Sequence, residues 1–129
     1  MQRRIFIKNR ADSPYVLLDA NEGYGEITGK SFPPDVSDFY NPLIEWFELF
    51  KLEIKQEFEL QIKLDYINTA SLKVLMDLMF KIEEVVKGGK KVEIKWFYPD
   101  DDFEMHEIGE EFERLIDVEF QYISYEKKL

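Results

Sequence analysis

The sequence predicts a single α/β domain, in which a mixed β-sheet is covered by about three helices and opens with a β-hairpin. Residues 58–66 alternate strictly between apolar and polar side chains, which is typical of a strand with one buried face. Apolar residues at three- and four-residue steps predict one helix before this strand in the chain and others after it. Because strands and helices then alternate, we expect a sheet that is parallel in its second half. The length of 129 residues fits one domain, spanning 1–129.

The first third of the chain has the features of a short antiparallel sheet. Residues 5–8 predict a short strand, and residues 15–19 and 24–28 predict a hairpin around a turn at 20–23 that contains Asn and Gly. Residues 29–35 end with two prolines and an aspartate, and we expect them to break regular structure because proline cannot continue a sheet ladder.

A first helix is predicted from about Asp38, with Pro42 tolerated in its first turn. Its apolar stripe consists of Leu43, Trp46, Phe47 and Phe50. In the strand that follows, the residues expected on the buried face are Phe58, Leu60, Ile62, Leu64 and Tyr66.

The second half of the chain predicts two more helices and two more strands. A helix over 71–87 ends at Gly88-Gly89, and its expected buried stripe is Leu72, Leu75, Met76, Met79, Ile82 and Val86. A strand over 92–98 follows, joined by a crossover that is right-handed by default. The last elements are a helix over 102–116, with Met105, Ile108, Phe112 and either Leu115 or Ile116 inward, and a strand over 118–125.

Charge and composition exclude several classes of function. With 27 acidic and 17 basic side chains the net charge is -10, which argues against nucleic acid and anionic membrane surfaces as partners. The absence of cysteine excludes disulfides, zinc–thiolate sites and cysteine nucleophiles, and His106 is the one histidine. No apolar run is long enough for a signal-peptide core or a membrane span, so we expect a cytoplasmic protein. There is no glycine-rich phosphate-binding loop, and we expect no cofactor.

Two loops are expected to meet at the carboxyl edge of the parallel strands, where ligand sites and switches gather. The first contains Asn68, Thr69, Ala70 and Ser71, at the start of the 71–87 helix. These polar residues are explained by helix capping, or alternatively by a phosphorylatable hydroxyl whose phosphate meets free N–H groups, with Lys73 as a countercharge.

The second loop, Asp100 to Asp102, begins a strongly acidic segment. Residues 100–117 contain nine acids and one arginine, which gives a net charge of -8. Such a segment is compatible with a solvated helix face whose acids complement the helix dipole. Alternatively, Asp100, Asp101 and Asp102 bind magnesium, as in a phosphoester hydrolase, or the segment docks a basic partner.

Three segments resemble the SiaC-like regulatory phosphoproteins. They are GKSFPPD followed by FYNPLIEW within 29–46, LDYINTAS at 64–71, and WFYPDDDFEMHEIGE at 96–110. They occur in order over most of the chain. The resemblance implies a fold similar to the STAS domain of anti-sigma-factor antagonists.

The resemblance also implies a role in partner switching. In this family a serine/threonine kinase of the anti-sigma-factor type phosphorylates the loop and a PP2C-type phosphatase reverses the modification. The unphosphorylated form of the best-known member activates a diguanylate cyclase and promotes biofilm. The acceptor position falls on Thr69, with Ser71 as second choice, and Ala70 replaces a serine. The expected partner-docking residues are Tyr66, Asp100, Asp101, Asp102 and Glu104.

Overall fold

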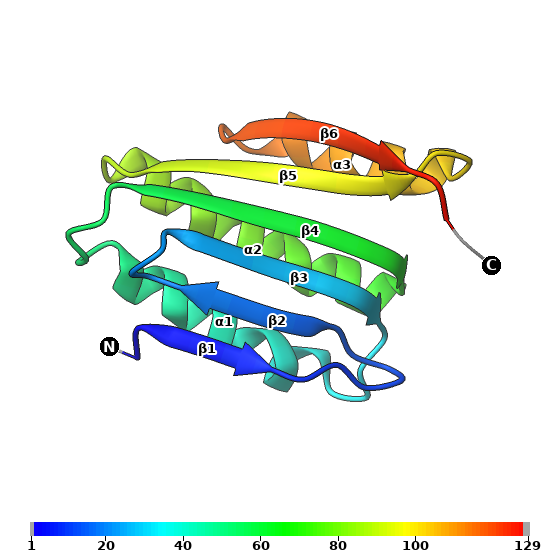
Figure 1. The fold of residues 1–129 in the computed structure, drawn as a ribbon, viewed down its shortest axis with the longest axis horizontal. Helices are drawn as coiled ribbons and strands as arrows, with labels where there is room; N and C mark the ends of the chain where they lie inside the picture. Colours follow the sequence, from blue (N-terminus) through cyan, green and yellow to red (C-terminus); the bar gives the residue numbers. More distant parts are fainter. Residues whose placement is uncertain (1, 128–129) are drawn as a thin grey trace.

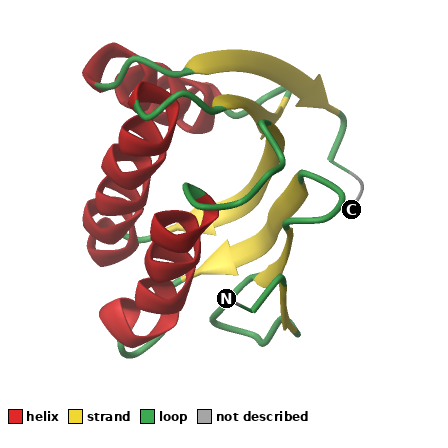
Figure 2. Cartoon of the chain, turned by 90° about the vertical axis from the view of Figure 1, so that its left-hand side faces the viewer, coloured by secondary structure: helices red, strands yellow, loops and turns green. Residues whose placement is uncertain are grey.

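A computed structural model describes residues 2–127, which form one six-stranded sheet with three helices on one of its faces (Figures 1 and 2). In chain order the elements are β1 (Arg4–Ile7), β2 (Tyr15–Asp19), β3 (Tyr24–Ser31), α1 (Val36–Phe50), β4 (Glu57–Ile67), α2 (Thr69–Lys87), β5 (Lys91–Pro99), α3 (Phe103–Leu115) and β6 (Glu119–Tyr125).

The strands lie in the sheet in the same order as in the chain (Figure 1). β1, β2 and β3 pair antiparallel, whereas β3, β4, β5 and β6 pair parallel. The prediction of an opening hairpin and a parallel second half is therefore confirmed. Each helix connects two neighbouring parallel strands, so the carboxyl ends of β4 and β5 lie next to each other.

The hairpin turn is built by Asp19, whose carboxylate accepts hydrogen bonds from the backbone N–H groups of Asn21 and Glu22 at 2.9 and 3.1 Å. Beyond it, the prediction that regular structure breaks from Gly29 is wrong for the first three residues. β3 continues to Ser31, which pairs with Ile67, because a register shift between Gly29 and Lys30 absorbs the irregularity. Gly29 has a φ of 126°, which a residue with a side chain rarely adopts.

Helix α1 begins two residues earlier than expected, because Asp35 caps it by accepting a hydrogen bond from Asp38 N at 3.0 Å. Pro42 consequently lies beyond the first turn, inside the helix, and not in the first turn as predicted. The predicted apolar stripe is confirmed, since Leu43, Trp46, Phe47 and Phe50 are buried.

Helix α2 is rotated relative to its predicted stripe. Leu75, Met79 and Ile82 are buried as expected, and Leu78 and Val85 join them. Three residues expected to be buried are only half-buried: Leu72, Met76 and Val86. The reason is that α2 packs on the sheet and along α1, so its side away from α1 stays partly open.

Helix α3 is held against β5 by a close approach at Gly109. A Cβ atom on Gly109 would lie 2.6 Å from the Trp96 ring, so the glycine lets the helix rest on the indole. Trp96 Nε1 also donates to the Met105 carbonyl at 2.9 Å. Of the two predicted alternatives Ile116 is the inward residue, whereas Leu115 is 52% exposed.

In strand β4 the predicted alternation holds for Phe58, Leu60, Ile62 and Leu64, all of which are buried. It is wrong for Tyr66, which is 50% exposed. The register shift against β3 leaves Asp65 without a partner in β3 and interrupts the alternation, so that Ile67 packs against the core in place of Tyr66. No helix in the part of the chain that the structure describes is long and apolar enough to cross a membrane.

Candidate functional site

The first candidate loop forms the N-terminus of α2. Asn68 is the N-cap residue, and its side-chain oxygen accepts a hydrogen bond from Ser71 N at 2.9 Å. Its backbone N–H donates to the Ser31 carbonyl at 3.0 Å, which ties the loop to the end of β3. A cap of this kind stabilises a helix by about 1 kcal/mol. The capping expectation is thus met by Asn68, which leaves the Thr69 hydroxyl free of that role.

The two hydroxyl residues of this loop have opposite environments. Thr69 is the first residue of α2 and is exposed, as are Ala70 and Lys73. Ser71 is completely buried. A protein kinase can therefore reach Thr69 in the folded protein, whereas Ser71 becomes accessible only if the start of α2 unfolds.

Ser71 belongs to a buried chain of hydroxyl groups. The Ser31 hydroxyl donates to Ser71 Oγ at 3.0 Å and lies 2.7 Å from the Tyr40 hydroxyl, and none of the three residues is exposed. Burial raises the pKa of Tyr40 to about 12, and the hydrogen bond to Ser31 acts in the opposite direction. This cluster joins β3, α1 and α2 at Ser71, two residues after the exposed Thr69, and sequence analysis alone did not find it.

The acidic loop also contains a cap. The Asp102 carboxylate accepts a hydrogen bond from Met105 N at 3.0 Å and begins α3, whereas Asp100 and Asp101 are exposed. Within residues 2–127, no three carboxylate or histidine side chains are grouped so that they could hold a metal ion. The geometry therefore offers no support for magnesium binding by Asp100, Asp101 and Asp102.

A hollow of 150 Å³ brings the end of β4 together with the start of α3. Its lining includes Asp65 and Tyr66 from β4, and Asp102 and Glu104 from the acidic loop and α3. Asp100 and Asp101 do not line it. The structure thus brings together three of the expected docking residues, Tyr66, Asp102 and Glu104. Of these, Tyr66 lies just before the Thr69 loop in the chain.

Tyr125 at the end of β6 contacts Asp65, one of the residues that line this hollow. The Tyr125 hydroxyl donates to Asp65 Oδ1 at 3.1 Å, and the Lys63 ammonium lies 4.4 Å from the centre of the Tyr125 ring. Partial burial raises the pKa of Tyr125 to about 12, and the hydrogen bond to Asp65 and the charges of Asp65 and Asp102 act in the same direction. The hydroxyl therefore stays protonated and keeps Asp65 in place.

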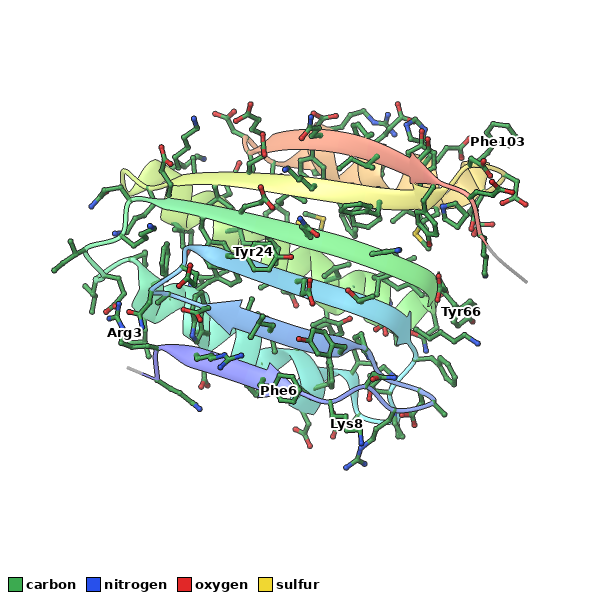
Figure 3. The ribbon with its side chains drawn as sticks, in the orientation of Figure 1. Arg3, Phe6, Lys8, Tyr24, Tyr66 and Phe103 are labelled. Atoms are coloured by element: carbon green, nitrogen blue, oxygen red, sulfur yellow. The ribbon has the colours of Figure 1, made fainter. Side chains whose placement is uncertain are left out.

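Exposed aromatic rings surround the acidic residues. Tyr66 is 50% exposed and packs edge-on against Phe32, with ring centres 5.6 Å apart. Phe103, the first residue of α3, is 78% exposed, and Figure 3 shows Tyr66 and Phe103 at the same end of the sheet. Exposed aromatic residues of this kind are enriched in protein–protein interfaces. Sequence analysis did not single out Phe32 and Phe103 as site residues, although both lie within the motifs that carry the resemblance.

The sequence of this chain is similar to a known protein family and to a protein of Pseudomonas aeruginosa. A family model described as "SiaC family regulatory phosphoprotein" matches residues 7–125. An uncharacterized protein of Pseudomonas aeruginosa (strain UCBPP-PA14) is 30% identical over 108 residues, which cover 84% of this chain and 86% of that protein.

Two solved structures from Pseudomonas aeruginosa have the same fold. SiaC superposes with a TM-score of 0.85 at 27% sequence identity, over 95% of this chain and 98% of the other. A chain in the crystal structure of the diguanylate cyclase SiaD in complex with its activator SiaC gives a TM-score of 0.87 at 27% identity, over 94% of this chain and 99% of the other. The likeness therefore extends over the whole sheet and its three helices.

Proposed function

The chain belongs to the SiaC family of regulatory phosphoproteins, and we propose that it controls a partner protein, a diguanylate cyclase, through reversible phosphorylation of Thr69. The unphosphorylated form binds the partner, and the phosphorylated form does not. The observation that carries this proposal is the exposed hydroxyl of Thr69 at the first position of α2.

The contrast with the neighbouring serine supports Thr69 as the acceptor. Ser71 is completely buried and its hydroxyl is held by Ser31, so its phosphorylation would require local unfolding. Thr69 needs no such opening. A phosphate at this position also lies next to the unpaired N–H groups of the first helical turn and to the positive end of the helix dipole. The folded protein therefore tolerates both states of Thr69.

The surface beside Thr69 supports partner docking. Tyr66, Asp102 and Glu104 line one hollow, and Asp100 and Asp101 are exposed next to it. A phosphate carries a charge of about -1.5 to -2 and binds water strongly. Placed next to these carboxylates, it adds local repulsion and a hydration shell that a docked partner would have to displace.

The switch requires two modifying enzymes. We propose a serine/threonine kinase of the anti-sigma-factor type, which must bring cations to so acidic a surface in order to place ATP, and a PP2C-type phosphatase. The protein itself acts as a substrate and a binding partner, and the hydrolase alternative has no supporting arrangement of Asp100, Asp101 and Asp102 within the described residues.

Co-purification from the native cell tests the proposal with four tagged forms: wild type, Thr69→Ala, Thr69→Asp and Ser37→Asp. Ser37 is also exposed in the first turn of a helix, α1, so it controls for a new carboxylate at a helix start. We expect Thr69→Ala and Ser37→Asp to retain the cyclase and Thr69→Asp to lose it. Intact-mass analysis should show one phosphate on the wild type and none on Thr69→Ala. Equal retention by Thr69→Ala and Thr69→Asp would refute the switch.

A further inference from the structure

A groove runs between α2 and α3 on the helical side of the molecule. It has a volume of 410 Å³, and its apolar lining comes from both helices: Leu72, Met76, Ile108, Phe112 and Leu115. The groove exists because α3 packs on β5 and β6, while α2 packs along α1 and hardly approaches α3. Leu115 is 52% exposed, and Phe80, one turn beyond Met76 on α2, is 44% exposed.

The spacing of these residues fits a helix as the occupant. On α2, Leu72, Met76 and Phe80 recur every four residues, and on α3, Ile108, Phe112 and Leu115 recur at four and three. Each wall is therefore a ridge of a helix, onto which the apolar stripe of another helix packs. An extended peptide would need free backbone hydrogen-bonding groups in the walls, and the interior of a helix provides none.

The charges around the groove indicate the polar side of the occupant. The outer side of α3 is acidic, with Glu104, Glu107 and Glu110. Glu111 lines the groove itself but is ion-paired with Arg114, and Lys73 lines the α2 wall, so the excess of negative charge lies along α3. A second copy of this chain, with its own net charge of -10, would bring acids against acids. A partner helix with lysine or arginine beside its apolar stripe is complementary instead.

We infer that the α2/α3 groove receives an amphipathic, basic helix of the regulated partner, with its apolar stripe between Met76 and Ile108 and its basic side toward α3. This inference rests on the proposed function, because it describes how the partner of that function binds. Leu72 and Lys73 are in the groove and lie one turn from Thr69, so the phosphorylation site is at the end of the groove.

This occupant also defines how the phosphate acts. The negative charge of a phosphate would attract a basic helix, so repulsion alone cannot release it. Release results from the volume of the phosphate and its hydration shell, which occupy the end of the groove. The apolar side chains of the partner must pack beside Leu72 at this same end, and they cannot do so next to a hydrated phosphate. The effect of phosphorylation should consequently persist at high salt, although partner binding itself weakens as salt screens the acidic wall.

A pair of synthetic helical peptides tests the inference. The basic probe has leucines at positions i, i+3, i+4 and i+7, with lysines beside them, and the acidic probe replaces each lysine by glutamate. Binding is measured by NMR titration of the ¹⁵N-labelled protein. We expect the basic probe to shift the amides of Leu72 and Ile108 and to bind at least tenfold more tightly than the acidic probe.

Matched variants separate groove binding from attraction to an acidic surface. Met76→Gln with Leu115→Gln makes both walls more polar without changing charge. Leu52→Gln with Ile54→Gln makes the same change at residues that are 81% and 93% exposed in the loop after α1. We expect the first pair to weaken the basic probe at least tenfold and the second pair to leave it unchanged. Circular dichroism confirms that both variants are folded.

Three results would overturn the inference: equal binding of the two probes, equal binding of the basic probe to both double variants, or shifts confined to residues outside α2 and α3. Self-association of the wild type that is abolished by Met76→Gln with Leu115→Gln would also overturn it, because the occupant would then be a second copy. The groove inference can fail while the proposed function holds. If the groove variant still retains the cyclase in a manner that depends on Thr69, the switch stands and the groove inference is wrong.

Discussion

The two sides of helix α2 differ in how they meet their neighbours. Toward α1 the helix is closely packed, and at its start the buried hydroxyls of Ser71, Ser31 and Tyr40 join it to β3 and α1. Toward α3 it stands apart and leaves an apolar groove lined by Leu72 and Met76. We call the side of α2 that faces α1 the closed side and the side that faces α3 the open side. Thr69 is exposed at the N-terminus of α2, where both sides begin. A modification there can therefore change the open side while the closed side keeps the helix in place.

The closed side depends on how firmly α1 is packed on the sheet, and Phe47→Ala is the strongest way to loosen that packing. Phe47 is completely buried and its ring contacts those of Trp46 and Phe58 at centre distances of 5.1 and 5.3 Å. We expect the free energy of unfolding to fall by about 3–5 kcal/mol, because a large cavity is left. Urea denaturation followed by tryptophan fluorescence measures the change. A loss below about 1 kcal/mol would contradict a rigid α1 side.

Gly109→Ala tests whether α3 is held by the sheet and not by α2. The added Cβ would lie 2.6 Å from the Trp96 ring, which is completely buried and cannot move without disturbing its neighbours. We expect a loss of about 1–3 kcal/mol in the same denaturation measurement. Gly88→Ala is the matched control, since an added Cβ there would meet its nearest atom at 3.4 Å. Equal effects of the two substitutions would show that contact with Trp96 does not position α3.

Tyr40→Phe probes the buried hydroxyl cluster. Removing the Tyr40 hydroxyl leaves Ser31 with one buried partner fewer and should cost about 1–2 kcal/mol at neutral pH. Tyr66→Phe is the control, because Tyr66 is 50% exposed, and it should cost less than about 0.5 kcal/mol. If the two variants were equally stable, the cluster would contribute nothing to the closed side.

The same variant has a distinct pH dependence. Folded Tyr40 keeps its proton until about pH 12, whereas the unfolded chain releases it near its ordinary pKa of 10.0. Between these values the folded state binds more protons, so the stability from this group is present below pH 10 and is lost as pH rises toward 12. The wild type should lose on the order of 2 kcal/mol more than Tyr40→Phe across this window. Parallel pH–stability curves would contradict the buried hydroxyl.

The open side should show the smallest effect. Leu115 is 52% exposed on the groove wall, and Leu115→Ala should change the free energy of unfolding by less than about 0.5 kcal/mol. Phe112→Ala is the contrasting variant on the same helix, since Phe112 is only 5% exposed and packs against Trp96. A Leu115→Ala loss comparable to that of Phe112→Ala would show that the groove is part of the core.

Most of the fold follows from local periodicity. The alternation over 58–66 and the three- and four-residue steps over 71–87 predict β4 and α2 correctly, because each pattern needs only one buried face. The direction in which α2 faces could not be predicted. Its apolar residues cover more than one stripe, and only the tertiary packing against α1 decides that Leu78 and Val85 are buried while Leu72 and Met76 line a groove.

The candidate site was predictable in position but not in detail. The two loops follow neighbouring parallel strands, which any such sheet brings to one edge. The family resemblance places the acceptor on Thr69, but the position of the two residues does not distinguish Thr69 from Ser71, since both are hydroxyl residues at a helix start. Burial distinguishes them, and it depends on Ser31 and Tyr40, which are 40 and 31 positions away from Ser71 along the chain.

In the proposed switch, a phosphate on Thr69 releases the partner without disturbing the fold. The direct measurement is a calorimetric titration of the proposed cyclase partner with two homogeneous proteins, one unmodified and one carrying phosphothreonine at position 69 introduced during translation. We predict equal unfolding temperatures for the two proteins and binding that is weaker by about 100-fold, or about 2.7 kcal/mol, for the phosphorylated one. Equal affinities for the cyclase would contradict the account.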